Sequence, residues 1–304
     1  MLDLTFDYAS CVRGSEKVSW RLDDVMPADT NLDFSRPFLP EALAGATRVP
    51  GLDPQERKTL NQISGNAYLN LFQFVEEYIL AAAVQQTHAE LFGDHEAVRA
   101  LLRFAEEEAK HQQLFWRYRE AFDRGVGKPC EVLGSATEVA RVILSKGPLA
   151  VTMVTCHLEL MTLQHYTECV RDDTGVDPLF SRLLKFHWLE ESQHAKIDAL
   201  ELDKLASRAT PSQIDAAFDD YLGICGAFDE LLAKQADLDV ASLATLTGRT
   251  FSDAEAKEIR ASQHASYRKT FLWYGMTNGT FQQYLAKLST HGAKRVAERA
   301  ATLA

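Results

Sequence analysis

Apolar residues recur every three or four positions through most of the chain after residue 52, which is the spacing of helices with one buried face. Residue types that favour helix starts and stops divide this pattern into segments. The predicted helices cover residues 53–91, 94–123, 135–146, 149–170, 177–207, 210–236, 252–274 and 280–300. No strand-like alternation and no internal repeat is found along the sequence, so the pattern predicts an all-α fold.

Local signals fix several of these boundaries. Asp53-Pro54 places a capping residue before a proline at the first helical position. Ser135-Ala-Thr-Glu138 fits a capping box, in which the serine and glutamate side chains bind each other's backbone N–H groups. Glycines between residues 275 and 279 predict a turn before the last helix.

The first 52 residues have a different character, with four prolines after residue 25 and little helical periodicity. We expect an extended, ordered lead-in that wraps the domain, anchored by Trp20, Phe34 and Phe38. Because no linker interrupts the rest, the chain is expected to form a single domain over residues 1–304. A four-helix bundle is predicted at residues 53–208, with accessory helices at residues 209–304.

Composition narrows the class of protein. Hydrophobic residues make up 46% of the chain and charged residues 25%, the balance of a soluble globular protein. The formal net charge of −11 argues against a nucleic-acid partner, and no run approaches the roughly 18 apolar residues of a membrane span. We find no signal-peptide pattern, and five scattered cysteines fit reduced thiols. A cytoplasmic location is therefore expected.

The segment KFHWLEESQHAK raises a question of chemistry. A helix turns about 100° per residue, so His187, Glu191 and His194 share one face. Two imidazoles and a carboxylate are costly to bury unless a partner compensates them. A bound metal ion is one such partner.

Three other predicted helices carry carboxylates in apolar surroundings. Glu108-Ala-Lys-His111 is an ExxH pair like Glu191-Ser-Gln-His194, and Glu159 lies among apolar residues. The first helix carries Glu76-Glu77 in a similar setting, where the more apolar face favours Glu76 and leaves Glu77 as the alternative.

The order Glu, ExxH, Glu, ExxH is the one by which a helical bundle holds two iron or manganese ions. In each half, 32 residues separate the two glutamates, as two long antiparallel helices with a short turn require. A single ExxH is a weak signal, and EEEAK at residues 106–110 also fits a solvated surface. The repeated order is more specific. The candidate ligands are Glu76, Glu108, His111, Glu159, His187, Glu191 and His194.

Asp198 and Glu201 continue the face of His194. They either hydrogen-bond a ligand imidazole, as metal-bound histidines usually require, or lie at the surface. The other histidines and the aromatic residues at 267–274 are expected to pack in the core or lie at the surface.

With these residues the chain resembles the ferritin-like di-iron carboxylate proteins, and among them the di-iron arylamine N-oxygenase family typified by p-aminobenzoate N-oxygenase. That family carries a third histidine in an HxxxExxH pattern, which His187, Glu191 and His194 match. Tyr68, eight residues before Glu76, also has a family counterpart. The resemblance covers roughly residues 55–205.

The resemblance implies a non-haem di-iron monooxygenase with O2 as co-substrate, two Fe ions as cofactor, and Mn as an alternative in one or both positions. It also implies a small-molecule substrate such as an aromatic amine, an external electron donor and a homodimer. The reaction would be N-oxygenation. The alternatives are C–H hydroxylation, desaturation or oxidative cleavage at the same site, a ferritin-class ferroxidase or iron-storage protein, and a helical scaffold that holds metal only for stability.

Overall fold

The computed structural model describes residues 2–303, which form helices and no strands. The helices are α1 (Tyr8–Val18), α2 (Leu22–Val25), α3 (Glu41–Ala44), the 3-10 turn η1 (Ala46–Arg48), α4 (Pro54–Glu90), α5 (His95–Val126), α6 (Ala136–Leu144), α7 (Pro148–His165), the π-helical turn η2 (Tyr166–Val170), α8 (Pro178–Ser207), α9 (Pro211–Thr247), α10 (Asp253–Arg268), the π-helical turn η3 (Lys269–Trp273), α11 (Tyr274–Thr277), α12 (Gly279–Leu288) and α13 (Thr290–Ala301).

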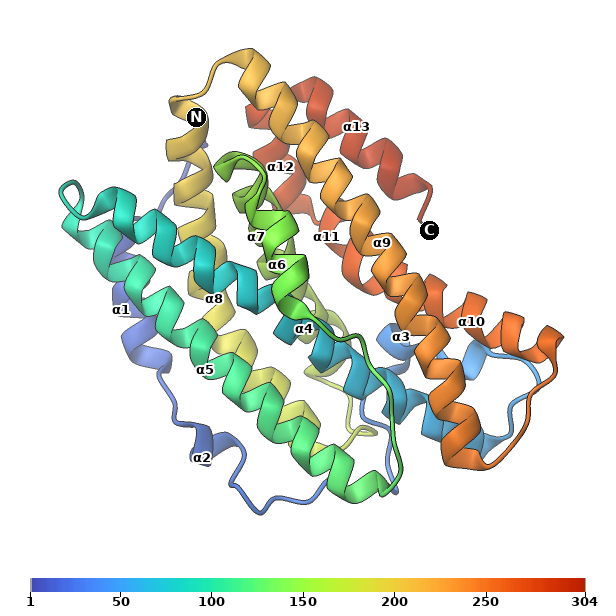
Figure 1. Ribbon diagram of the computed structural model, residues 1–304. Coiled ribbons are helices and arrows are strands. Elements are labelled where there is room, and N and C mark those ends of the chain that lie inside the picture. Colours follow the sequence, from blue (N-terminus) through green and yellow to red (C-terminus); the bar gives the residue numbers. More distant parts are fainter. Residues whose placement is uncertain (1, 304) are drawn as a thin grey trace.

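Four long helices build the centre of the molecule (Figure 1). α4 packs along α5 and α7 along α8, while α5 also contacts α8. α9 lies against both α4 and α7, and α6 covers α4. The structure confirms the predicted all-α fold, with a four-helix bundle at its centre and additional helices around it.

The bundle helices begin where the sequence predicts. Asp53 accepts a hydrogen bond from the backbone N–H of Glu56 and Pro54 occupies the first turn of α4, as the capping pattern requires. Asp177 caps α8 in the same way, with Pro178 as its first residue. Proline here fixes the backbone angle φ without removing an intrahelical hydrogen bond.

Several boundaries differ from the prediction. Ser135 has a φ of 68°, a left-handed conformation, and makes no side-chain cap, so the predicted capping box is wrong. α9 continues to Thr247 instead of about residue 236, because its buried face extends to Leu243 and no helix breaker occurs before Gly248. The predicted last helix is two helices, separated at Ser289, whose extended backbone and side chain cap α13.

The N-terminal segment also differs from the extended lead-in that we expect from its prolines. Asp7 and Ser10 form a capping box that begins α1, and α1 packs against α5 and α8. The approach to α8 is close, because a Cβ atom added at Gly14 would lie 2.2 Å from the Gln193 side-chain oxygen. Prolines cluster only after residue 25, so they do not oppose a helix at residues 8–18.

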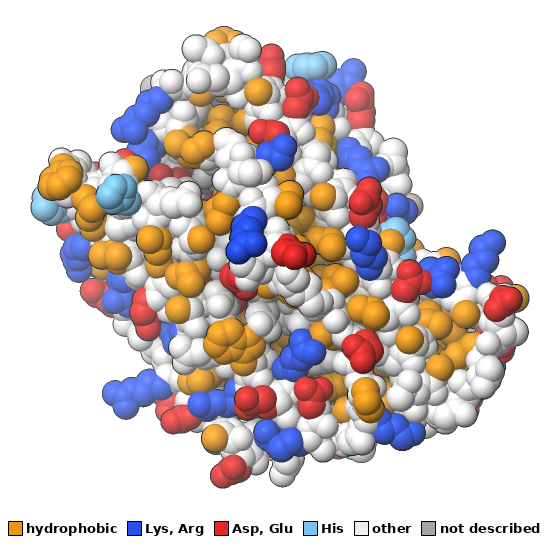
Figure 2. Space-filling view, viewed as in Figure 1, with side chains coloured by type: hydrophobic (Ala, Val, Ile, Leu, Met, Phe, Trp, Pro, Cys, Tyr) orange, Lys and Arg blue, Asp and Glu red, His pale blue; other side chains and the backbone are white. Residues whose placement is uncertain are grey.

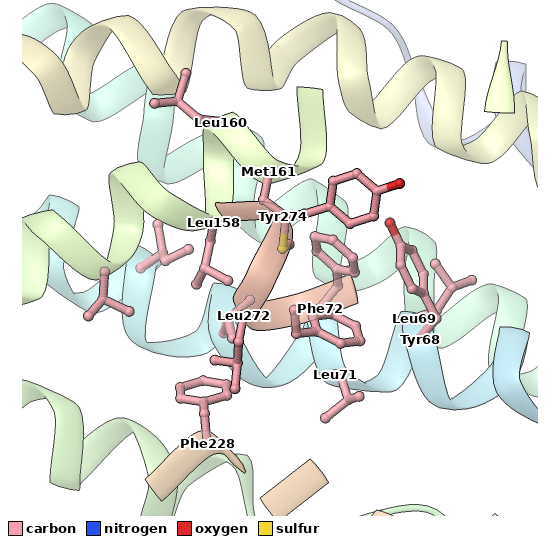
Figure 3. Packing of buried hydrophobic residues seen from close by; sticks show 14 of the residues in the cluster. Tyr68, Leu69, Leu71, Phe72, Leu158, Leu160, Met161, Phe228, Leu272 and Tyr274 are labelled. Atoms are coloured by element: carbon pink, nitrogen blue, oxygen red, sulfur yellow. The ribbon is translucent and has the colours of Figure 1, made fainter. Parts of the chain in front are cut away.

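The interior is apolar and rich in aromatic rings (Figure 3). On the face drawn in Figure 2, acidic and basic side chains are interspersed with hydrophobic atoms. All five cysteines are free thiols. None of the helices in residues 2–303 combines the length and apolarity that crossing a bilayer needs.

Candidate metal centre

The four bundle helices bring the seven candidate side chains into the buried centre of the molecule. Each of the seven is at most 3% exposed. α4 supplies Glu76, α5 supplies Glu108 and His111, α7 supplies Glu159, and α8 supplies His187, Glu191 and His194. Burying this many ionisable groups without a compensating cation would be strongly unfavourable.

Two overlapping groups of donor atoms have the spacing of metal sites. Within each group the ligand atoms all lie within 4.8 Å of one another. One group consists of Glu76, His111, His187 and Glu191, and the other of Glu108, His111, Glu191 and His194. Since the groups share two members, they lie side by side, as a dinuclear centre requires.

Glu191 lies between the two groups. Its Oε1 atom is 2.6 Å from His187 Nε2 and 3.2 Å from His111 Nδ1, whereas its Oε2 atom is 2.9 Å from His194 Nδ1. The two oxygens of one carboxylate thus face different imidazoles. Glu191 thus contacts histidines of both donor groups.

Glu159 is buried but belongs to neither group. Its pKa is raised well above the ordinary value, first by burial and then by the negative charge of Glu191, with which it shares a hydrogen bond. Glu159 therefore lies beside Glu191.

Burial and the charges of neighbouring groups shift the pKa values of the candidate ligands in both directions. Burial, then the nearby charge of Glu108, raises the pKa of Glu76 to about 8. Burial opposes ionisation of Glu191 as well, but His187 and His194 hold its pKa well below the ordinary value. In the opposite sense, burial would lower the pKa of His111, but the carboxylates of Glu190 and Glu191 raise it well above the usual value.

Two carboxylate oxygens in the centre have no hydrogen-bond partner. They are Glu76 Oε2 and Glu108 Oε2, whereas Glu108 Oε1 lies 2.9 Å from His194 Nδ1 and His111 Nδ1 lies 3.2 Å from Glu191 Oε1. Buried polar atoms are nearly always paired, so these two free oxygens indicate a ligand in the centre. Carboxylate oxygens with imidazole nitrogens form a donor set that suits iron and manganese, and the residues present therefore fit a dimetal cofactor.

Two further carboxylates, which the sequence patterns do not single out, hold the outer sides of the ligand histidines. Glu190 Oε2 lies 2.9 Å from His111 Nε2, and Glu107 Oε2 lies 3.0 Å from His194 Nε2. Glu107 directly precedes Glu108 on α5 and binds a histidine of α8. Glu190 directly precedes Glu191 on α8 and binds a histidine of α5. These contacts fix each imidazole so that Nδ1 faces the centre.

The two outer carboxylates are neutralised differently. Glu190 forms a buried ion pair with Lys110, with Nζ 2.5 Å from Oε1. Glu107 accepts a hydrogen bond from the hydroxyl of Ser15 on α1, and the guanidinium of Arg103 is 3.8 Å away. α1 thus completes the surroundings of one histidine from outside the bundle.

The two ExxH helices differ most at one equivalent position. Phe104 precedes Glu108 by four residues, as His187 precedes Glu191. Phe104 stacks on His194 with ring centroids 4.1 Å apart, whereas His187 packs against His111 at 4.6 Å. The third histidine therefore adds a donor on one side of the centre only.

The alternatives left open by the sequence take distinct places. Glu76 faces the centre, while Glu77 accepts a hydrogen bond from Thr137 at the surface. Asp198 is buried with an unpaired Oδ2 atom, and Glu201 binds Tyr8 and Lys204. No hydrogen bond from Asp198 or Glu201 to a ligand imidazole is found among the described residues, where Glu107 and Glu190 have that role.

Comparison with known proteins identifies a family that matches most of the chain. The model of the family described as p-aminobenzoate N-oxygenase AurF matches residues 12–224, a range that includes all seven candidate ligands. Among curated protein sequences, none matches this chain.

Solved structures of a similar shape include an R2-like ligand-binding oxidase with an aerobically reconstituted Mn/Fe cofactor, at 14% identity and a TM-score of 0.45, covering 88% of this chain and 94% of that one. A variant of that oxidase with an aerobically reconstituted Fe/Fe cofactor matches at 14% identity and a TM-score of 0.45, covering 96% and 94%.

Proposed function

The chain belongs to the p-aminobenzoate N-oxygenase family, and from that premise we propose that it uses O2 to oxygenate the nitrogen of a small aromatic amine. The observation that carries the proposal is the third histidine of the centre. His187 Nε2 lies 3.0 Å from Glu76 Oε1 and 2.6 Å from Glu191 Oε1, inside the first group of donor atoms.

The proposed cofactor is a pair of iron ions, with manganese as an alternative in either position because the donor set accepts both. The proposed ligand atoms are Nδ1 of His111 and of His194, Nε2 of His187, and the carboxylates of Glu76, Glu108, Glu159 and Glu191. When bound, the metal pair supplies the electron transfer to O2 that amino-acid side chains cannot provide.

The protein's own contribution is orientation and exclusion of water. Aromatic rings surround the ligand histidines: Phe72 and Phe115 pack edge-on against His187, Phe104 stacks on His194, and Trp20 stacks on His111. A dry, low-dielectric surrounding strengthens the interactions between the carboxylates and any cation they hold. We propose an external electron donor and leave the choice of amine to experiment.

The test begins with metal-free protein loaded anaerobically with Fe(II) and supplied with p-aminobenzoate, ¹⁸O2 and a chemical reductant. Mass spectrometry should detect hydroxylamine, nitroso or nitro products that carry ¹⁸O on nitrogen. His187→Ala should abolish these products and leave the helical circular dichroism unchanged, while the surface control Glu77→Gln should retain them.

Other outcomes would redirect the proposal. Oxygen on a ring or side-chain carbon would indicate a hydroxylase on the same site. Continuous uptake of added iron beyond two ions per chain, with no oxygenated product, would indicate a ferroxidase of the ferritin class. Full activity of the His187 variant would contradict the proposal directly.

A further inference from the structure

A row of aromatic and imidazole rings leads from His187 to the surface. Phe72 lies 5.4 Å from His187 between ring centroids, Tyr68 lies 4.8 Å from Phe72, and His165 lies 6.0 Å from Tyr68. The row continues outward to Tyr274, whose ring is 5.0 Å from His165. Figure 3 shows Tyr68, Phe72 and Tyr274 grouped in the apolar core.

The middle of the row is a hydrogen-bonded pair. The hydroxyl of Tyr68 lies 3.0 Å from His165 Nδ1, and both side chains are at most 2% exposed. Burial lowers the pKa of His165 to about 3, so the ring is neutral. In the tautomer that carries its hydrogen on Nε2, the imidazole accepts the phenol hydrogen at Nδ1. Loss of an electron makes a phenol far more acidic, and this pair has the proton acceptor in place.

The outer end of the row reaches the surface through η3 and α11. Trp273 lies 5.3 Å from Tyr274 between ring centroids and is partly exposed. The Tyr274 hydroxyl is 3.6 Å from the half-buried thiol of Cys169. Indole, phenol and thiol are the side chains most readily oxidised by one electron, and here they cluster where the row meets solvent.

Trp273 lines a cavity of about 510 Å³ with a basic wall. Arg48, Arg268 and Lys269 line this wall. The Asp229 carboxylate that pairs with Arg268 is shared with Arg299, which lies outside the lining, so it does not fully neutralise Arg268. No Asp or Glu side chain is among the described residues that line the cavity. On a chain with a net charge of −11, this wall would attract a small anion.

We propose that Tyr68, His165 and Trp273 form a protective oxidation relay, which draws oxidising equivalents away from the metal centre and discharges them to a small anionic reductant of the ascorbate class in the basic cavity. The inference rests on the proposed oxygenase function, because that chemistry supplies the oxidising equivalents. The relay acts when O2 has reacted and no amine is bound to consume the product of that reaction.

The relay is balanced in electrons and protons. Tyr68 passes one electron inward across Phe72 and its phenolic proton to His165 Nδ1. Trp273 then returns an electron to Tyr68, which recovers its proton from His165. The reductant gives one electron to Trp273 and one proton to solvent. Two such cycles would supply two electrons. Together with two electrons from divalent metal ions held by the centre and four protons from solvent, they would complete the reduction of one O2 to two water molecules.

A second aromatic contact with the centre is a poorer route. Trp20 stacks on His111, but it is buried and its next ring contact is Phe186, which is not readily oxidised. Trp273, in contrast, is partly exposed and meets the cavity.

The first experiment exposes the iron-loaded chain to O2 without amine and freezes samples for electron paramagnetic resonance. A transient tyrosyl signal is expected in the wild type and should disappear in Tyr68→Phe. Tyr118→Phe is the matched control, because Tyr118 is equally buried and lies outside the row. Peptide mass spectrometry should find oxidation at Cys169 and Trp273 in the wild type, and several-fold more oxidation at Phe72 and His187 in Tyr68→Phe.

The second experiment adds ascorbate and follows decay of the radical signal. Decay should slow as salt is added, and it should slow several-fold in the double variant Arg48→Glu/Lys269→Glu. The matched control Arg141→Glu/Lys234→Glu makes the same charge change at exposed positions away from the cavity and should decay like the wild type.

The outcomes separate the two proposals. If labelled amine products form but Tyr68→Phe leaves the radical and the oxidation sites unchanged, the relay is wrong and the oxygenase stands. If Trp20→Phe removes the radical signal instead, oxidising equivalents leave the centre through His111 and Trp20, and the relay is likewise wrong. If neither the wild type nor any variant consumes O2 or forms product, the proposed oxygenase function is wrong, and the relay that rests on it is wrong as well.

Discussion

The α5/α8 pair and the α4/α7 pair both send carboxylates to one centre, yet they treat their buried histidines in opposite ways. His111 and His194 have carboxylates within hydrogen-bond distance of both ring nitrogens. His157 on α7 instead meets the Tyr221 hydroxyl and the Phe271 carbonyl, and burial lowers its pKa to about 4. The surroundings of His111 and His194 thus favour positive charge, whereas the surroundings of His157 keep its imidazole neutral.

The comparison teaches how a buried imidazole can be recognised as a metal ligand. Burial alone is common to both groups and does not distinguish them. What distinguishes His111 and His194 is a carboxylate on the outer nitrogen together with carboxylates facing the inner one, which is the arrangement that orients a metal-bound imidazole. His165, beside a phenol, belongs with His157.

The largest effect is expected from substitution of Glu191, which tests whether this carboxylate of α8 joins the two donor groups. Glu191→Ala should lose both metal ions, because Glu191 is a member of both groups, whereas Glu76→Ala should retain about one ion per chain. Metal content measured by elemental analysis after gel filtration distinguishes the two variants. Retention of two ions by Glu191→Ala would remove the bridging role.

A second prediction compares the two outer carboxylates. Glu190→Gln leaves Lys110 largely buried without its partner and should cost about 3–5 kcal/mol of unfolding free energy, while Glu107→Gln should cost about 1–2 kcal/mol. Urea denaturation of the metal-free chain gives both values. Each variant should also weaken metal binding by roughly 10–100-fold, through the histidine of the opposite helix.

The matched control for this pair is Lys110→Met. Combined with Glu190→Gln, it removes the unpaired charge and should restore most of the stability lost in Glu190→Gln alone. Equal destabilisation by the single and double variants would show that the ion pair does not account for the difference between the two carboxylates.

A third prediction uses the pH dependence of the neutral histidine. Because the pKa of His157 is about 4 in the folded chain and near 6.5 when unfolded, the unfolded state binds the proton more readily. The stabilisation is present above pH 6.5 and is lost as the pH falls towards 4, by up to about 3 kcal/mol. His157→Gln should remove this part of the pH dependence and leave the part that His165 supplies, because burial lowers the pKa of His165 to about 3. Denaturation at several pH values measures the difference between the variant and the wild type.

The sequence predicts much of this arrangement because helix signals are local. Proline after Asp53 and after Asp177 begins α4 and α8, and ligand spacing on one helix is fixed by its turn. The outer carboxylates Glu107 and Glu190 are missed for a different reason. The repeated EExxH pattern is visible in the sequence, but which histidine each glutamate meets depends on the register between α5 and α8. That register is a property of packing, as is the contact of α1 with Glu107.

The smallest expected effect concerns two neighbouring residues of α4. Glu76 is buried among the ligands, whereas Glu77 is partly exposed and accepts a hydrogen bond from Thr137 on α6. Glu77→Ala should change the unfolding free energy by about 0.5 kcal/mol or less, because surface substitutions rarely do more, and should leave metal content unchanged. A loss of metal in Glu77→Ala as large as in Glu76→Ala would mean that α4 presents a different face to the centre. The assignment of Glu76 as the ligand from α4 would then be wrong.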